Sequence, residues 1–181
     1  VDLGTSSIKL TLIDSLGNIL NEVSKDYPLY QKGLYSEQNP EDWWEAFTFC
    51  FDKLLEQQDR DCLEGLSFSG QMHGLVLLDK NDRIIRSCIL WNDGRSEEET
   101  KYLNEVVGKD KLSEWTGNIA YAGFTAPKLL WVKNHEKELF QNIDKIMLPK
   151  DYIAYRLTGV FATDYSDASG TLYLDVKNKK W

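Results

Sequence analysis

The most constraining feature of the chain is a change of hydrophobic period within its first sixty residues. Residues 8–14 alternate apolar and polar side chains, residues 15–18 are turn formers, and residues 19–23 read as a return strand. A period of two broken by a polar turn predicts two antiparallel strands. From Trp43 to Leu54 apolar residues recur at helical spacing, behind the helix start Asn39-Pro40. Strands joined to helices predict an α/β domain.

The rest of the chain extends this pattern. Further strands are expected at residues 63–69, 75–78 and 84–91, and residues 164–175 are expected to form a loop and then a strand at 172–174. Helices are expected at residues 96–107, 111–114, 126–134, 136–141 and 151–157. Gly108 and Gly159 follow two of these helices and are expected to end them. The 181 residues suffice for one domain.

Charge and cysteine usage exclude several classes of function. The chain has 21 basic and 29 acidic residues, a net charge of −8, which argues against nucleic-acid binding. No apolar run is long enough to span a membrane. Three cysteines without C-x-x-C spacing and two histidines argue against a zinc cluster. We expect a cytoplasmic enzyme with reduced thiols, no nucleic-acid partner and no membrane partner.

The first candidate site is the glycine-containing segment between the first two strands. It reads Asp2-Leu3-Gly4-Thr5-Ser6-Ser7 and is followed by Lys9. Glycine permits a tight turn whose N–H groups, with nearby hydroxyls, can surround an anion. An aspartate at a strand end can hold Mg²⁺, usually through water, and the lysine adds a positive charge. These features suit nucleotide phosphates, although a plain hairpin turn explains the same residues.

Two further segments follow predicted buried strands. Ser69-Gly70-Gln71-Met72-His73-Gly74 lets a histidine and a methionine project from the sheet edge, where they can contact a small polyol. The alternative is a hairpin whose histidine bonds a local carbonyl. Trp91-Asn92-Asp93-Gly94-Arg95 ends a strand, where α/β sheets bind ligands. We therefore consider Trp91, Asn92 and Asp93 as pocket residues, with an Asx turn and helix cap as the alternative.

A fourth segment is rich in charges and hydroxyls. Lys150 and Asp151 are expected to cap a helix, and residues 163–171 are expected to form a loop that could reach a sugar. Asp164 and Asp167 are three residues apart, so they would lie close together if that loop were helical.

Taken in order, these segments resemble the FGGY carbohydrate kinases, relatives of the hexokinases in the actin-like ATPase superfamily. The opening segment is similar to the first phosphate signature of that superfamily. The resemblance covers the whole chain, and it is carried by residues 2–6, 70–74, 91–95, 124–132, 148–152 and 166–171. It implies a ribonuclease H-like fold of the actin/hexokinase type, in which helices flank a mixed β-sheet.

The resemblance also implies an activity, namely ATP-dependent phosphorylation of D-xylulose to D-xylulose 5-phosphate. Asp2 would serve the Mg²⁺–phosphate end and be needed for activity, Met72 and His73 would contact the sugar, and the loop at Gly123 and Phe124 would border it. The residues implied to line the ATP phosphates are Gly4, Thr5 and Ser6. Glycerol-phosphorylating members carry Arg-Glu in place of Met72-His73, which favours xylulose over glycerol.

One departure from the family pattern limits this interpretation. The general-base aspartate and the second domain are expected beyond Trp181, so residues 1–181 are interpreted as an N-terminal domain truncated at both ends and inactive alone. The partners implied are a small-molecule sugar and ATP, and a homodimer is left open. The alternatives are an FGGY kinase for another ketose, polyol or sugar acid, and a non-catalytic sugar-binding module.

Overall fold

The computed structural model describes residues 1–181. The first three strands of the chain belong to its main sheet. The sheet has four strands in the order β3-β2-β1-β6. The strands are β1 (Asp2–Leu3), β2 (Ser7–Ile13), β3 (Ile19–Asp26) and β6 (Ser69–Gly70). β1 pairs antiparallel with β2 and parallel with β6, so the sheet is mixed.

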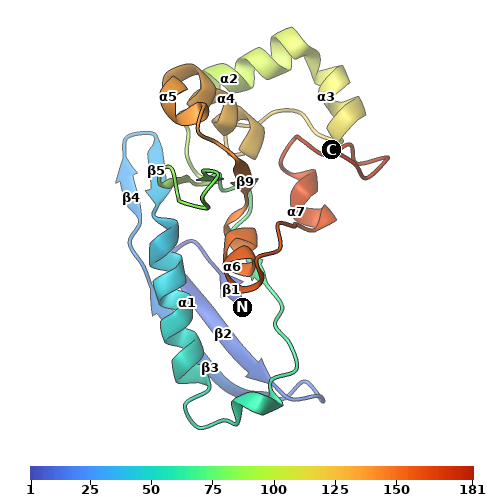
Figure 1. Cartoon of the computed structure of the whole chain (residues 1–181). Helices are drawn as coiled ribbons and strands as arrows, with labels where there is room; N and C mark the ends of the chain where they lie inside the picture. Colours follow the sequence, from blue (N-terminus) through green and yellow to red (C-terminus); the bar gives the residue numbers. More distant parts are fainter.

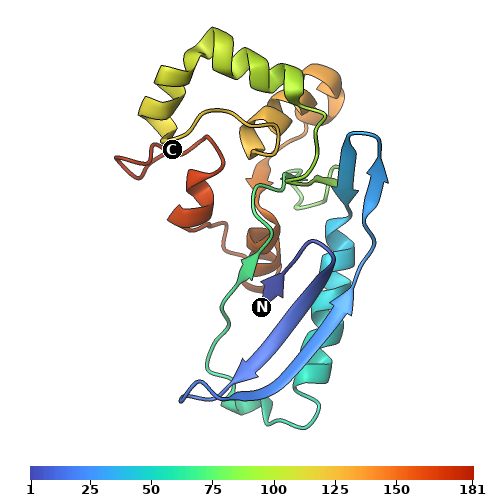
Figure 2. The ribbon, with the colours of Figure 1, turned by 180° about the vertical axis from the view of Figure 1, so that it is seen from behind.

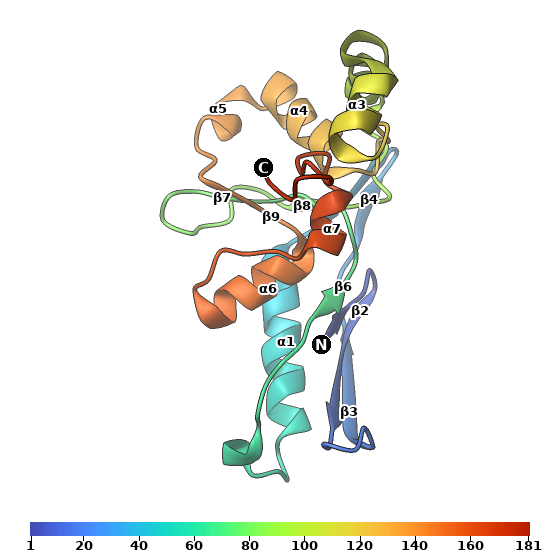
Figure 3. The same cartoon turned by 90° about the vertical axis from the view of Figure 1, so that its right-hand side faces the viewer.

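A single long helix covers one face of this sheet. α1 (Pro40–Leu54) begins where the Asn39 side chain accepts a hydrogen bond from the backbone N–H of Glu41. The buried face of the helix packs on the inward-facing residues of β1 and β2 (Figure 3). These are Trp43, Ala46, Phe47, Cys50 and Leu54 on the helix, and Leu3, Ile8 and Leu10 on the strands. The predicted hairpin and helix are confirmed.

Two smaller sheets lie beyond the main one. They are formed by β4 (Tyr30–Lys32), β5 (Tyr35–Gln38) and β8 (Cys88–Ile89), and by β7 (Val76–Leu78) with β9 (Lys145–Met147). Strands β4, β5 and β9 were not predicted, because strands of three or four residues leave almost no periodic signal in a sequence.

Helices α2 to α5 gather at the end of the molecule away from the β2–β3 hairpin, and α6 and α7 lie between them and the hairpin (Figure 1). They are α2 (Glu97–Tyr102), α3 (Lys109–Thr116), α4 (Thr125–His135), α5 (Lys137–Phe140), α6 (Pro149–Thr158) and α7 (Tyr165–Ser169). A π-helical segment (Leu103–Gly108) joins α2 to α3, and a 3₁₀ turn (Arg60–Cys62) follows α1. Gly159 ends α6 at φ 70°, as predicted, whereas Gly108 separates two helical segments. None of the helices is long and apolar enough to cross a membrane.

Three predicted elements are corrected by the structure. Of residues 63–69, only the end pairs with a neighbour, because β1 offers just two residues for pairing, and Leu66 is exposed. In the run 84–91 only residues 88–90 are buried, and its backbone contacts are divided between residues 75–78 and β5, so only Cys88–Ile89 forms a strand.

The third correction concerns residues 164–175. Asp164 accepts a hydrogen bond from the N–H of Asp167 and starts α7, so the predicted loop is helical there. No strand forms at 172–174, since Leu172 has a φ of 64°, which an extended strand cannot accommodate.

Candidate functional site

Two of the predicted site loops leave the sheet at the same end. β1 and β6 are parallel neighbours, with Leu3 opposite Gly70, and the Gln71 N–H donates to the Leu3 carbonyl at 2.7 Å. The loop at residues 4–6 and the loop at residues 71–73 therefore emerge side by side. In Figure 3, β6 points toward α7 and the helical end of the molecule. The parallel pairing thus places the loop at residues 4–6, which carries hydroxyl groups, beside the loop at residues 71–73, which carries the methionine and the histidine.

The turn after β1 is tight because glycine occupies its first position. The Gly4 N–H donates to the Ser7 carbonyl at 3.0 Å, and a Cβ at residue 4 would lie 3.0 Å from the same oxygen. The Gly4 carbonyl accepts the Tyr27 hydroxyl, and burial with the nearby charge of Asp2 raises the pKa of Tyr27. The Tyr27 hydroxyl thus fixes the turn on its inner side, while Ser6 remains exposed at the tip of the turn.

Leu3 packs in the core with α1, so its neighbour Asp2 lies on the opposite face of the sheet, which is turned toward the viewer in Figure 2. Asp2 is exposed and takes part in none of the ion pairs of the structure. Lys9 stands opposite Asp2 in the β1–β2 register, so both side chains share one face, but the Lys9 ammonium pairs with Glu22 at 3.6 Å. The Asp2 carboxylate is therefore free to meet an external cation or phosphate-bound metal.

A buried glutamine connects the two loops. Gln38 is fully buried at the end of β5, and its Nε2 donates to the Thr5 carbonyl at 2.7 Å. Its Oε1 accepts from Trp43 Nε1 at 3.1 Å and from Gln71 Nε2 at 2.9 Å. Because a buried amide must satisfy all its polar atoms, Gln38 fixes the first loop, the second loop and α1 relative to one another. No local sequence signal identified this residue.

His73 sits in a restrained position on the second loop. Its backbone is left-handed at φ 62°, and its ring stacks on Phe124 with centroids 4.4 Å apart. Nδ1 is buried without a hydrogen-bond partner. Burial, followed by the positive charge of Lys128, lowers the pKa of His73, while the negative charge of Asp167 opposes this. A neutral imidazole with an unpaired buried nitrogen suits hydrogen bonding to a hydroxyl group.

The third segment joins the same site through its tryptophan. Trp91 Nε1 donates to Thr5 Oγ1 at 3.0 Å, and 43% of the Trp91 side chain remains exposed. Gly123 lies directly against the Trp91 carbonyl, where any Cβ would collide with that oxygen. The structure thus brings Trp91, Gly123, Phe124 and the loop at Thr5 together.

Asp93 has a structural role instead of facing this site. It is buried, and its carboxylate accepts hydrogen bonds from the Ser36 N–H at 2.6 Å and from the backbone and guanidinium of Arg95. The Asx turn anticipated as an alternative is therefore present. Asn92 is exposed, and Met72 is 45% exposed beside His73.

The charged fourth segment forms a cluster of ion pairs, and the end of this segment lies against His73. Lys150 Nζ pairs with Asp151 at 2.6 Å, Asp164 at 2.7 Å and Asp167 at 3.2 Å, which fastens α7 to the start of α6. Gly170 follows α7, and a Cβ there would lie 2.9 Å from His73 Nδ1. The predicted proximity of Asp164 and Asp167 is confirmed, whereas their shared lysine was not foreseen.

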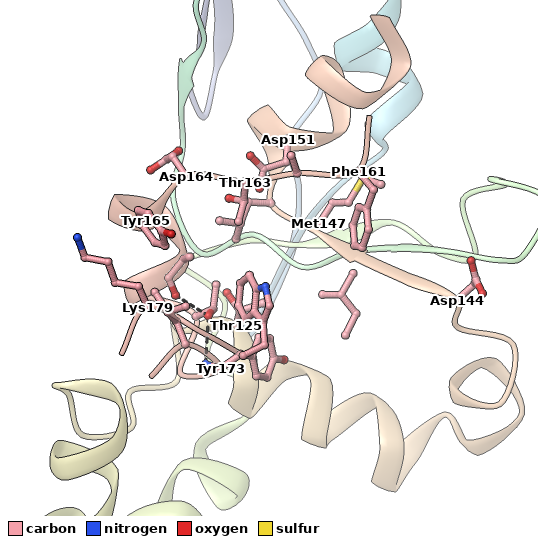
Figure 4. Close-up of a pocket in the computed structure, with 17 residues that line it drawn as sticks. Thr125, Asp144, Met147, Asp151, Phe161, Thr163, Asp164, Tyr165, Tyr173 and Lys179 are labelled. Carbon is pink, nitrogen blue, oxygen red and sulfur yellow. Dashed lines mark hydrogen bonds between the residues drawn. The ribbon is translucent and has the colours of Figure 1, made fainter. Parts of the chain in front are cut away.

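A separate cavity of about 670 Å³ lies between α7, the end of the chain and the β9–α6 region (Figure 4). Its lining is mostly apolar, and the Tyr173 hydroxyl within it has no partner. Neither loop of the candidate site contributes to it. A sugar needs several convergent polar partners, so the loops at Thr5 and His73 fit sugar and phosphate chemistry better than this cavity does.

Comparisons with known proteins agree with this architecture. The family described as "FGGY family of carbohydrate kinases, N-terminal domain" matches residues 1–181. A curated "Xylulose kinase" from Bacillus subtilis (strain 168) is 48% identical over 185 residues, covering 100% of this chain and 37% of that protein. The chain therefore spans little more than a third of the relative's length.

Several solved structures share the fold. The crystal structure of a "xyloylose kinase" from Brucella ovis has a TM-score of 0.94 at 40% identity, covering 99% of this chain and 38% of the other. A gluconate kinase from Lactobacillus acidophilus has a TM-score of 0.93 at 31% identity, covering 99% of this chain and 37% of the other. The backbone alone thus does not distinguish one sugar from another.

Proposed function

The chain belongs to the FGGY family of carbohydrate kinases, and we propose that its protein transfers the γ-phosphate of ATP to the terminal hydroxyl of D-xylulose. The observation that carries the proposal is the shared exit of the Thr5 loop and the His73 loop from the parallel strands β1 and β6. The 48% identity to a protein named for xylulose supports the choice of sugar.

Each loop has a separate task in this proposal. The backbone N–H groups and hydroxyls of Gly4, Thr5 and Ser6 hold the phosphates, with Lys9 as a nearby positive charge. Met72 and His73 bind the sugar, and Phe124 supports the imidazole from its other face. Phosphoryl transfer needs mainly correct positioning and neutralised charge, so a rigid link between the loops through Gln38 serves the chemistry directly.

The family also implies Mg²⁺, and the residues present fit a loosely held ion. Asp2 is an exposed carboxylate without an internal cation partner, and no group of three or more acidic, histidine or cysteine side chains converges to form a protein cage. Mg²⁺ in kinases is commonly held by one or two carboxylates together with substrate phosphates and water. When bound, the ion would neutralise phosphate charge beside Asp2.

We further propose that residues 1–181 are the N-terminal domain of a two-domain kinase. The chain spans 37% of the Bacillus subtilis relative, which supports a larger working protein. The general base that takes the proton from the sugar hydroxyl is assigned outside these residues, together with most of the adenine pocket. Closure of two domains would exclude water from the transferring phosphate.

The test is sugar-dependent ADP release by the protein expressed from its complete gene. D-xylulose, D-ribulose, D-gluconate and glycerol are compared at equal concentration, with a reaction lacking sugar as the background. D-xylulose is expected to give the highest kcat/KM. Absence of ADP release with every sugar would contradict the kinase assignment and favour a non-catalytic sugar-binding module.

A second substrate class is retained because of one observation. The gluconate kinase from Lactobacillus acidophilus shares the fold almost as well as the Brucella ovis enzyme does. A higher kcat/KM for D-gluconate than for D-xylulose would move the assignment to a sugar acid while leaving the kinase reaction in place.

A further inference from the structure

Lys128 is a fully buried lysine near the start of α4, and it has no ion pair in the structure. Its Nζ donates to three backbone carbonyls instead: His73 at 2.7 Å, Leu90 at 3.1 Å and Ile89 at 3.3 Å. An ammonium group has three donors, so all of them are used. A buried charge without a counter-charge is costly, which makes a purely packing role a poor explanation for a lysine here.

The three carbonyls belong to the His73 loop and to the strand end that leads to Trp91. One is that of His73, whose left-handed backbone is strained for a residue other than glycine. Another is that of Leu90, the residue before Trp91, whose indole bonds Thr5. Thr125 Oγ1 adds a second bond to the His73 carbonyl at 3.1 Å. The start of α4 therefore bonds both the His73 loop and the strand end that carries Trp91.

We propose that Lys128 is a positioning residue of the sugar site, because its ammonium holds the His73 backbone in place and joins it to the strand end that carries Trp91. The proposal rests on the assignment of His73 to the sugar made above. Lys128 touches neither substrate in this scheme and acts only through His73.

The electrostatics of the site agree with this geometry. Burial lowers the pKa of Lys128 to about 7, and the charged or titratable groups that face it are Cys88, Asp93 and Arg95. The Lys128 charge in turn lowers the pKa of His73, against the opposing effect of Asp167. The Lys128 ammonium thus opposes protonation of the His73 imidazole, in addition to the larger effect of burial.

The kinetic test compares Lys128→Met with Lys133→Met in the protein expressed from its complete gene. Lys133 lies on the same helix and is exposed, so it is a matched control. Lys128→Met is expected to raise KM for D-xylulose by roughly tenfold or more, and KM for ATP by less than about twofold. Unchanged KM for the sugar, or an equal rise in both constants, would overturn the proposal.

Thr125→Val is the milder second variant, in case Lys128→Met does not fold. It removes one of the two side-chain donors to the His73 carbonyl and keeps the shape of the side chain. KM for the sugar is expected to rise by about two- to fivefold, with kcat nearly unchanged. A Thr125→Val enzyme that matches the unaltered protein in sugar KM would count against positioning by α4.

A measurement independent of activity is an NMR titration of the imidazole protons. The titration is made on the protein expressed from its complete gene, and His73→Gln assigns the His73 signals. Lys128→Met is expected to raise the pKa of His73 and to shift its ring protons as the stacking on Phe124 loosens, while Lys133→Met leaves His73 unchanged. An unaltered His73 titration would refute the inference. If the unaltered protein phosphorylates no sugar, the proposed function fails, but this titration still decides the role of Lys128.

Discussion

Gly170→Ala is expected to impair sugar use by a purely steric effect on His73. A Cβ at residue 170 would lie 2.9 Å from His73 Nδ1 and closer still to Cε1. Ordinary contact begins at 3.4 Å, so Nδ1 must retreat by 0.5 Å (3.4 − 2.9), and Cε1 must move further. Phe124 stacks on the imidazole at 4.4 Å and restricts its movement.

The size of the effect follows from this displacement. A misplacement of order 1 Å can cost roughly 10²-fold in rate, so kcat/KM for D-xylulose is expected to fall about 10- to 100-fold. This corresponds to about 1.4 to 2.7 kcal/mol of transition-state stabilisation. The backbone of residue 170 has φ −85° and ψ −2°, which alanine adopts easily, so the fold should persist.

The assay measures kcat and KM for the sugar and for ATP in the protein from the complete gene, together with thermal unfolding. Gly65→Ala is the matched control, because a Cβ at residue 65 meets nothing within 4 Å. The reasoning would be refuted if Gly170→Ala folded normally and used D-xylulose as well as the control did.

Three further outcomes are expected. Asp2→Ala should lower kcat by at least about 10²-fold without changing thermal stability, since Asp2 is exposed and unpaired; retained kcat would contradict its role. Asp93→Ala should lower the free energy of unfolding in urea by about 3 kcal/mol, because it leaves the Ser36 N–H unpaired and removes one of the two carboxylates that pair with buried Arg95. The pKa of His73 is lowered from 6.5, so the unfolded chain binds its proton first and stability should fall as pH drops below about 6.5. His73→Gln should remove that part of the pH dependence, and an unchanged profile would exclude it.

The elements that could be predicted from sequence are those with local causes. The β2–β3 hairpin has a clear period of two, and α1 has a capping asparagine, a proline at its start and an apolar stripe. The run at residues 63–69 misled the prediction because apolar composition does not reveal whether a neighbouring strand exists. Pairing is a long-range property, and β1 offers only two residues.

The loops of the candidate site could be predicted from the sequence, but the buried residues that hold these loops in place could not. The glycine-bounded segments around Thr5 and His73 stand out in the sequence as turn chemistry with functional side chains. Gln38 and Lys128 have no such signal, since an isolated glutamine or a lysine in a helical pattern normally lies on the surface. Their burial depends on contacts with residues 33 and 55 positions away, which only the folded chain reveals.

The most direct test of this account is a crystal structure of the protein from the complete gene with D-xylulose and a non-hydrolysable ATP analogue. A sugar hydroxyl is expected within about 3 Å of the His73 imidazole, and the terminal phosphate against the turn at residues 4–6. Density for the sugar in the cavity beside Tyr173, or for the phosphates on the sheet face beneath α1, would contradict the assignment of both loops.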